Sequence, residues 1–304
     1  MTTKNKILII GGTGFIGYHL AKRSLKEGWK VTSVSTRKPK KLRYISKVKY
    51  LICDITKKRS LKNKIKTNYN LVVNVGGYVD HSNKKKTYDS HYLGVKNLTN
   101  IFSTNPPKSF VQIGSGGEYG KSKSPHREIT KGKPLSIYYK AKLLSSFHLI
   151  KLFKKNNFPS TVLRLYQVYG PKQDLNRFIP IIINSCIKNK KFPCSDGKQF
   201  RDFIFIDDLI DAIIKSLKNK KARGQILNIG SGKPIKIKNI IEYINNKIAK
   251  GYPIYGKIKL RKDENIKTYP DIKKVKKLIN WQPKVSFYSG LKKTINFYNG
   301  KKKI

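Results

Sequence analysis

Near the start of the chain, residues 9–17 read Ile9-Ile10-Gly11-Gly12-Thr13-Gly14-Phe15-Ile16-Gly17. This stretch follows a short apolar run and precedes an amphipathic helical pattern, which is the usual context of a dinucleotide-binding turn. Glycine permits the tight turn and lets the backbone approach a pyrophosphate, which then lies at a helix N-terminus. The stretch therefore predicts a dinucleotide site, and the alternative is a purely structural glycine turn. The residues expected at this site are Gly11, Gly14, Phe15, Ile16 and Gly17.

Short apolar runs alternate with helical patterns through the first two-thirds of the chain. The expected strands are residues 7–10, 31–34, 48–52, 71–75, 110–113 and 161–165. The expected helices are residues 16–26, 60–66, 88–103 and 138–155. Strands that are apolar throughout are typical of a parallel sheet covered on both faces. The alternation predicts an α/β fold with a doubly wound parallel sheet of the Rossmann type.

The pattern loosens after Pro171, although no long flexible linker separates the remaining pieces. We predict a dinucleotide-binding Rossmann domain over residues 1–170, with a return segment at about residues 203–230. Residues 171–202 and 231–304 are expected to form a smaller C-terminal substrate lobe that is interleaved with that domain. Asp207 and Asp208 stand where a helix should begin, which predicts that they act as N-cap residues.

The charge of the chain is unusual. Its 67 Lys and Arg residues against 16 Asp and Glu residues give a formal net charge of +51. Such an excess attracts nucleic acid or anionic membrane without specificity, and it would also steer an anionic nucleotide substrate to the protein. The lysines are scattered and form no single stripe, so a tolerated surface bias and a functional affinity for polyanions both stay open. We expect no specific nucleic-acid partner.

Several absences bear on location. No apolar run approaches the ~20 residues that cross a bilayer, so membrane insertion is not expected. The N-terminus enters a strand pattern without an apolar segment and cleavage site, so we expect no signal peptide. Cys53, Cys186 and Cys194 have no paired or metal-type spacing, which fits a reducing compartment. These features predict a cytoplasmic protein without a metal site.

The end of the second expected strand, Val34-Ser35-Thr36-Arg37-Lys38, bears on the choice of dinucleotide. An NAD site usually has Asp or Glu near this point to bind the ribose 2′-hydroxyl, and none is present here. Hydroxyls followed by cations suit a 2′-phosphate, so Thr36 and Arg37 predict NADP, with NAD still possible. The alternative is that these cations belong to the general lysine bias. Asp54 and Ile55, after the third expected strand, are expected beside the adenine.

A second motif, Tyr138-Tyr139-Lys140-Ala141-Lys142, places a tyrosine and a lysine one helical turn apart. Tyr138 and Lys142 are at positions i and i+4, so they share a helix face. A tyrosine with a pKa near ~10 is a poor base at neutral pH, and a nearby ammonium lowers that pKa by favouring the phenolate. Ser115, which lies just after the fifth expected strand, would hydrogen-bond the same substrate oxygen. The three residues predict proton transfer to or from an alcohol, and the alternative is a chance pattern on a helix surface.

Five ordered motifs resemble those of the extended short-chain dehydrogenase/reductases, the nucleotide-sugar epimerase/dehydratase family, over nearly the whole chain. They are residues 11–17, Ile113-Gly114-Ser115-Gly116-Gly117-Glu118-Tyr119-Gly120, and residues 134–142, 163–171 and 197–209. The resemblance implies an NAD(P)-dependent oxidoreductase acting on a nucleoside-diphosphate sugar for polysaccharide biosynthesis. It also implies that Ser115, Tyr138 and Lys142 are catalytic, that the C-terminal lobe binds the sugar nucleotide, and that the protein is a homodimer.

The same resemblance assigns substrate contacts to Gln167, Arg201 and Arg261, the arginines through pyrophosphate or ribose oxygens. For either arginine, the alternative is ordinary surface solvation. Asp80 and His81 follow a Gly-Gly-Tyr-Val run and are expected to line the sugar pocket. For these two residues, helix capping or a surface position is the alternative.

Departures from the family pattern narrow the range of possible reactions. Gln167 stands where the family mostly has Asn, and His91 stands where the helix before Gly94 usually starts with Asn. Gly116-Gly117 replaces the Asp-Glu pair of the dehydratases, and elimination of water needs that acid/base pair, so 4,6-dehydration is disfavoured.

Two reactions at C4 of the sugar remain open. One is reduction of a 4-keto sugar, in particular a 4-keto-6-deoxyhexose, by NADPH. The other is 4-epimerisation with tightly bound NAD. The missing acidic ribose ligand favours reduction. A non-catalytic nucleic-acid-binding module is the third hypothesis, and the intact Ser-Tyr-Lys group argues against it.

Overall fold

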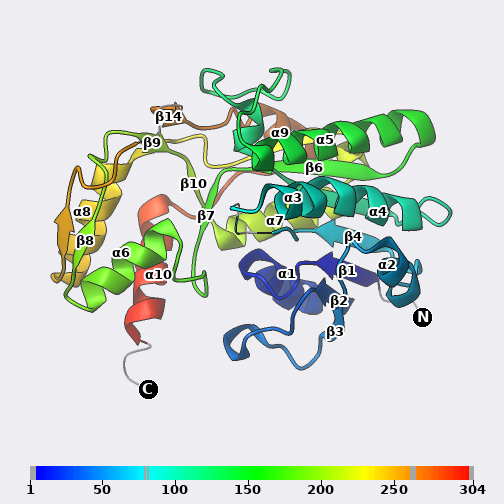
Figure 1. Ribbon diagram of the computed structural model, residues 1–304, viewed down its shortest axis with the longest axis horizontal. Coiled ribbons are helices and arrows are strands. Elements are labelled where there is room, and N and C mark those ends of the chain that lie inside the picture. The colour runs from blue at the N-terminus through cyan, green and yellow to red at the C-terminus, as the bar shows by residue number, and fades with distance from the viewer. Residues whose placement is uncertain (1–4, 79, 81, 261–264, 301–304) are drawn as a thin grey trace.

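The computed structural model describes residues 5–78, 80, 82–260 and 265–300. Its centre is a seven-stranded parallel sheet in the order β11-β6-β5-β4-β1-β2-β3 (Figure 1). These strands are β1 (Lys6–Ile10), β2 (Lys30–Ser35), β3 (Lys49–Ile52), β4 (Leu71–Asn74), β5 (Ser109–Ser115), β6 (Ser160–Leu165) and β11 (Ile226–Ile229). The strand order reverses between β1 and β4, and open α/β sheets bind ligands at such a switch point. The predicted doubly wound Rossmann fold is confirmed.

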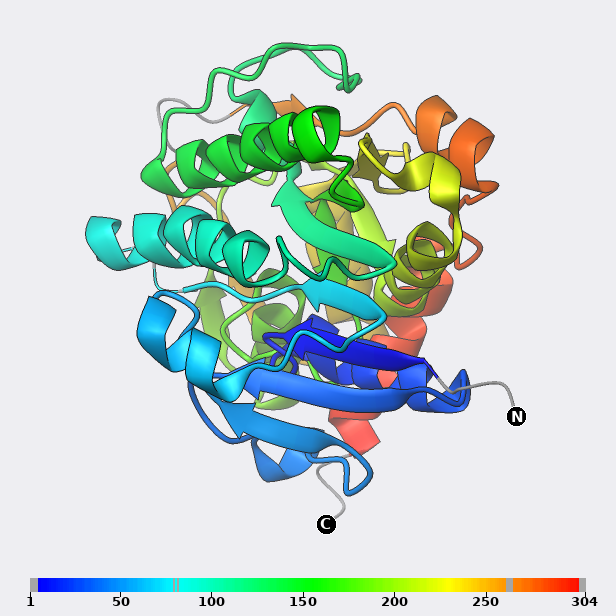
Figure 2. The same cartoon turned by 90° about the vertical axis from the view of Figure 1, so that its right-hand side faces the viewer.

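Helices cover both faces of this sheet. Ile7 and Ile9 of β1 belong to one core with α1 (Phe15–Lys26) and α7 (Ile206–Lys218). Leu8 and Ile10 belong to a second core on the opposite face, whose helices are α2 (Lys58–Lys64), α4 (Gly94–Ile101) and α5 (Ile137–Asn156). Figure 2 shows α2, α4 and α5 on one side of the sheet and α7 on the other. Among the described helices, none has both the length and the apolar character to cross a membrane.

A second group of elements lies beside one end of the sheet, at the left of Figure 1. Its helices are α6 (Phe178–Ile187), α8 (Ile237–Ile248) and α10 (Phe287–Gly300), and β8 (Lys191–Pro193) pairs with β13 (Tyr252–Ile254). Short strands connect the two groups: β7 (Gln167–Tyr169) pairs with β10 (Phe203–Phe205), and β9 (Phe200–Arg201) lies between β12 (Ile235–Lys236) and β14 (Lys267–Thr268). Helix α9 (Lys273–Ile279) packs near β11.

The helix expected over residues 88–103 is divided. Helix α3 (Lys84–Tyr88) is followed by a π-helical turn, η2 (Asp89–Leu93), and α4 begins only at Gly94. Single π-helical turns occur frequently at functional sites. The side chain on this turn that bears on the site is His91.

The prediction that Asp207 and Asp208 cap a helix is wrong. Helix α7 begins at Ile206, and no side chain caps its N-terminus. The buried Asp208 carboxylate instead accepts hydrogen bonds from the backbone N–H groups of Lys284 and Val285, both at 3.0 Å. Asp208 therefore fastens a distant segment of the chain to α7, which a local pattern does not reveal.

Candidate active site

The turn after β1 is packed so closely that side chains would not fit. Gly11 has a φ of +81°, and an added Cβ there would lie 2.6 Å from the Cα of Gly76. A Cβ at Gly12 would lie 2.7 Å from Ser33 Cβ, and a Cβ at Gly17 would collide with the Gly11 carbonyl oxygen. Glycine is therefore required at three positions of the motif for the reasons that a dinucleotide turn demands.

Helix α1 begins directly after this turn with an open N-terminus. Its N-cap is Gly14, no side chain accepts from its first N–H groups, and its first turn contains no acidic residue. Free amides and the helix dipole favour an anion at such an end. Phe15 and Ile16 form the start of the helix and are half-buried. Because this end lies at the switch point of the sheet, it fits the pyrophosphate of a dinucleotide.

The candidates for the adenosine half lie together at the ends of β2 and β3, which are hydrogen-bonded to each other. Thr36 and Arg37 are exposed just beyond β2. Asp54 is half-buried, and its Oδ1 accepts from the N–H of Thr56 at 2.9 Å and from its Oγ1 at 2.8 Å. Ile55 is buried beside it. The four predicted residues therefore share one edge of the sheet.

Ser115 ends β5, and Tyr138 and Lys142 lie near the start of α5. Lys142 Nζ donates to the Ile113 carbonyl oxygen at 2.7 Å and lies 5.9 Å from the centre of the Tyr138 ring. Ser115 Oγ accepts from the Gly117 N–H at 3.2 Å, so its own proton is left to donate to a substrate oxygen. The lysine thereby fixes the start of α5 against the strand that carries the serine.

The electrostatic environment of Tyr138 differs from the expectation. Burial raises the pKa of Tyr138, and Tyr139 and Glu118 raise it further. Burial also lowers the pKa of Lys142 to about 8, while Glu118 acts in the opposite direction. The expected lowering of the Tyr138 pKa is not met, because the ammonium is itself buried and is directed at Ile113. Tyr138 therefore keeps its proton at neutral pH and can act as an acid.

His91 borders Tyr138 from the π-helical turn. The two rings meet edge to face with their centres 4.8 Å apart, and His91 Nε2 lies 3.1 Å from the Tyr78 carbonyl oxygen. An added Cβ at Gly77 would collide with the imidazole. Ser145 Oγ on α5 donates to the His91 carbonyl oxygen. His91, which stands where the family pattern has Asn, is thus in direct contact with Tyr138, the candidate acid.

Tyrosine rings cover the two glycines that follow Ser115. A Cβ at Gly116 would lie 2.8 Å from Cζ of Tyr166, and a Cβ at Gly117 would collide with the ring of Tyr139. The Tyr166 hydroxyl lies 2.8 Å from His126 Nδ1, which holds that ring in place. Packing, as well as sequence, therefore excludes an Asp-Glu pair at these positions.

Gln167 and Arg201 lie close together where the two groups of elements meet. The Gln167 N–H donates at 3.0 Å to the carbonyl oxygen of Asp202, the residue next to Arg201. Gln167 is exposed and Arg201 is half-buried. The Arg201 guanidinium donates to the carbonyl oxygens of Phe200 at 2.8 Å and Ile266 at 3.3 Å. Contacts with backbone carbonyl oxygens therefore orient the Arg201 guanidinium, which is a candidate for binding the substrate.

Asp80 is exposed in the loop after β4. Its Oδ1 accepts from the Ser82 N–H at 3.1 Å, and its Oδ2 accepts from the Tyr78 hydroxyl at 3.3 Å. The loop lies beside the site, because the Tyr78 carbonyl oxygen contacts His91. The predicted residues His81 and Arg261 lie outside the described residues.

A buried ion pair beneath Ser115 was not predicted. The Glu118 and Arg164 side chains are 0% and 2% exposed, and Arg164 Nε donates to Glu118 Oε2 at 2.8 Å. Glu118 Oε1 accepts from the Ser115 N–H at 2.8 Å. The available signal was an arginine within the otherwise apolar run of residues 162–165, since a buried cation needs a buried partner.

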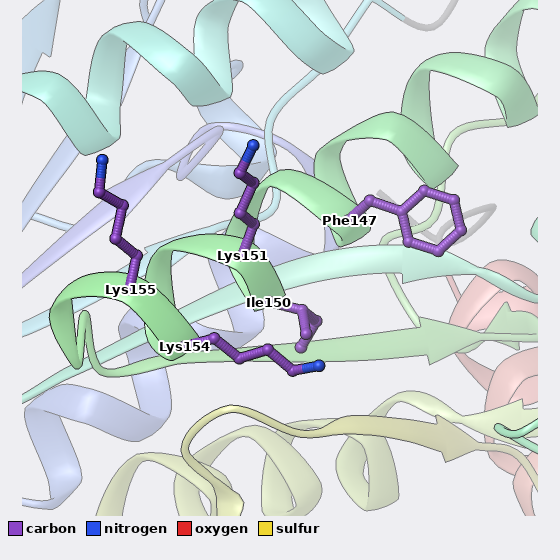
Figure 3. A pocket seen from close by; sticks show the side chains of 5 residues that line it. All are labelled: Phe147, Ile150, Lys151, Lys154 and Lys155. Carbon is purple, nitrogen blue, oxygen red and sulfur yellow. The ribbon is translucent and has the colours of Figure 1, made fainter.

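A surface pocket on α5 is separate from this site. It is lined by Phe147, Ile150, Lys151, Lys154 and Lys155, which point from the outer face of the helix (Figure 3). Phe147 is nine residues beyond Tyr138, and at 1.5 Å per residue this is about 14 Å along the helix axis. The pocket therefore has no part in the catalytic group.

The chain is similar to several known proteins. The family model described as "NAD dependent epimerase/dehydratase family" matches residues 7–230. A UDP-glucuronate 4-epimerase of Thermodesulfobacterium geofontis is 30% identical over 309 residues, with 95% of each chain covered. A dTDP-4-dehydro-6-deoxyglucose reductase of Escherichia coli is 27% identical over 308 residues, with 96% of this chain and 97% of the relative covered. The structure of a UDP-glucose 4-epimerase of Thermotoga maritima with UDP-glucose shares the fold, with a TM-score of 0.90 at 22% identity over 97% of this chain and 99% of that one.

Proposed function

The chain belongs to the NAD dependent epimerase/dehydratase family, and from this premise we propose that it reduces a nucleoside-diphosphate 4-keto sugar, most specifically a 4-keto-6-deoxyhexose. The observation that carries the proposal is the end of β2, where exposed Thr36 and Arg37 stand where an NAD site has a carboxylate. Tyr138 supplies the acid, because a tyrosine keeps its proton at neutral pH and the surroundings of Tyr138 raise its pKa further. Reduction of a ketone needs such an acid, whereas oxidation of an alcohol would need the phenolate as a base.

Reduction at C4 adds a hydride to carbon and a proton to oxygen. The reduced nicotinamide, when bound, supplies the hydride. Tyr138 gives its hydroxyl proton to the C4 oxygen, and Ser115 donates a hydrogen bond to the same oxygen while negative charge develops there. Lys142 would hold the nicotinamide ribose, and its hydrogen bond to the Ile113 carbonyl oxygen fixes α5 beside Ser115. The tyrosinate then regains a proton from solvent, and the product is the C4 alcohol.

Recognition of NADP in preference to NAD is the second element of the proposal. Thr36 and Arg37 are exposed at the end of β2, and neither of them offers the carboxylate that a ribose 2′-hydroxyl prefers. A guanidinium there suits a 2′-phosphate. Asp54 and Ile55, at the same edge, would contact the adenine.

The substrate would lie between the sheet and the second group of elements. We assign residues 1–170 with the return segment at about 203–230 to the cofactor, and residues 171–202 and 231–304 to the sugar nucleotide. The pyrophosphate and ribose would be bound by Arg201 and Arg261, and the sugar by Gln167, Asp80 and His81. The position of Gln167 beside Arg201 supports this assignment.

A homodimer is also proposed, on the family resemblance. The outer face of α5 supports it, because Leu144 and Phe147 are 39% and 54% exposed there. Association of two copies through this face would bury both side chains. Analytical ultracentrifugation or light scattering of the purified protein measures its oligomeric state directly.

The alternative reaction is 4-epimerisation. A relative that is 30% identical is a UDP-glucuronate 4-epimerase, and such a reaction would use the same Ser-Tyr-Lys group. An epimerase must keep its nicotinamide bound through two half-reactions, since release would strand an oxidised sugar. A reductase must exchange its cofactor at every turnover.

This difference gives the test. The absorbance of the purified protein is recorded before any cofactor is added, and NADPH oxidation is then followed with 4-keto-6-deoxy sugar nucleotides. We expect a protein largely free of nicotinamide that consumes NADPH in proportion to the ketone. Co-purifying NAD, with interconversion of two sugar nucleotides and no loss of NADPH, would establish the epimerase instead.

A further inference from the structure

Glu118 contacts each of the elements that carry the catalytic group. We infer that it is a positioning residue, which holds Ser115 against α5 and supplies the buried negative charge that faces Lys142. The inference rests on the proposed function only in treating Ser115, Tyr138 and Lys142 as the catalytic group. It applies equally to a reductase and to an epimerase.

The carboxylate of Glu118 reaches two elements at once. Its Oε1 accepts from the Ser115 N–H at 2.8 Å, which completes a capping box at the start of the 3₁₀ helix η3 (Gly116–Tyr119). Its Oε2 accepts from Ser146 Oγ at 2.8 Å. Ser146 lies one turn beyond Lys142 on α5, and its Oγ is 3.1 Å from the Lys142 carbonyl oxygen. One side chain thus sets the position of the serine relative to the helix of the lysine.

The fold makes room for this carboxylate and its counter-ion. An added Cβ at Gly114 of β5 would lie 2.6 Å from Glu118 Oε1, so a side chain there would displace the carboxylate from its position. Arg164 Nε donates to Oε2 at 2.8 Å, and its guanidinium lies 4.5 Å from the centre of the Tyr119 ring. Removing two charges from water is costly, and apolar residues often stabilise such a site equally well. A role in the adjacent site gives this pair a function that apolar packing would not supply.

Of the charged groups around Tyr138 and Lys142, Glu118 is the one that acts on Lys142. It raises the pKa of Lys142 against the effect of burial, which lowers that pKa to about 8. The other titratable neighbours act on Tyr138: Tyr139 on the same helix raises its pKa, and Arg177 before α6 lowers it. His91 on η2 contacts the Tyr138 ring. Loss of the Glu118 charge should therefore leave Lys142 deprotonated at a lower pH.

Two substitutions that remove charges of opposite sign test the inference. Glu118→Gln removes the negative charge, and Arg164→Gln removes the cation that partly neutralises it. The readout is the affinity for NADPH or NADH, whichever binds, measured by nicotinamide fluorescence across the alkaline range, because Lys142 is expected to hold the nicotinamide ribose. At alkaline pH the cofactor affinity should fall as Lys142 loses its proton. We expect the midpoint of this fall to lie roughly one pH unit lower in Glu118→Gln than in the wild type, and to lie higher in Arg164→Gln.

Structural damage alone would not shift this pH in opposite directions in the two variants, because each variant leaves one buried group of the pair without its partner. The double variant Glu118→Gln/Arg164→Gln removes both charges, and it serves as the test if a single variant does not fold. Its alkaline loss should stay at the lower pH of Glu118→Gln, because the carboxylate is still missing. A double variant with the wild-type profile, or single variants that shift in the same direction, would overturn the inference. Expected pH shifts in a protein that reduces no sugar nucleotide would instead refute the proposed function alone.

Discussion

The ring of Tyr139 fills the space in front of Gly117, so that any side chain at position 117 would collide with it. The rings of Tyr138 and Tyr139 lie 5.0 Å apart, and the ring that closes this space therefore borders the candidate acid as well. Gly117 and Tyr139 act as one packing unit. The glycine is required because the tyrosine is present.

Gly117→Glu should destabilise the protein and should not create a dehydratase. Forcing a side chain into a packed site costs about 1–3 kcal/mol, measurable as a lower midpoint of urea unfolding. Gly300→Ala is the matched control, because a Cβ at Gly300 would meet no atom within 4 Å. The double variant Gly117→Glu/Tyr139→Ala should recover stability. A Gly117→Glu protein as stable as the wild type would show that the Tyr139 ring moves freely.

Tyr138→Phe should lose turnover while keeping its affinity for the dinucleotide. The variant lacks only the hydroxyl that supplies the proton, and general acid catalysis contributes about 10²- to 10⁴-fold. Tyr139→Phe is the control, because it removes a hydroxyl from the adjacent ring and preserves the packing against Gly117. Steady-state rates and cofactor titrations of both variants make the comparison. Near-normal turnover in Tyr138→Phe would remove the central claim.

Arg37→Asp should weaken NADPH binding far more than NADH binding, because only NADPH carries the 2′-phosphate. Loss of a hydrogen bond to a charged group corresponds to roughly 10- to 100-fold in affinity. Lys30→Asp makes the same change of charge at the opposite end of β2, where Lys30 is exposed, and it should affect both cofactors equally. Equal losses for both cofactors in Arg37→Asp would mean that this residue does not read the phosphate.

The parts of the fold that depend on local pattern could be predicted from sequence. The apolar runs located the parallel strands, since a strand covered on both faces has few polar positions. The glycine turn was predictable because its geometry excludes side chains at Gly11 and Gly17 whatever the rest of the chain does. The placement of Tyr138 near Lys142 followed from the helical repeat alone.

The parts that depend on contacts between distant segments could not be predicted. Glu118 and Arg164 are 46 residues apart, and only the pairing of β5 with β6 brings them together. The raised pKa of Tyr138 follows from burial, which is a property of the whole packed site. Asp208 was misread as a cap because its true partners are 76 and 77 residues away.

Asp208→Ala should therefore reduce stability much more than Asp207→Ala. Asp208 is buried, and its loss would leave the N–H groups of Lys284 and Val285 without their acceptor. A hydrogen bond to a charged group contributes about 1.5–3 kcal/mol. Asp207 is exposed one position earlier on the same helix, so its removal should be nearly neutral. Thermal unfolding of both variants measures the difference, and equal midpoints would disprove the assigned role of Asp208.

Turnover should decline as the pH rises through about 8, because burial lowers the pKa of Lys142 to about 8. Below that pH the ammonium is present to bind the ribose, and above it the amine is neutral and should bind the ribose less tightly. The raised pKa of Tyr138 works in the same favourable sense, since the acid stays protonated throughout this range. Lys142→Arg is the control: arginine stays charged, so whatever activity remains should lose this alkaline decline. A wild-type profile of kcat/KM that stays flat to pH ~10 would mean that Lys142 keeps the ordinary lysine pKa of ~10.4 in the working enzyme.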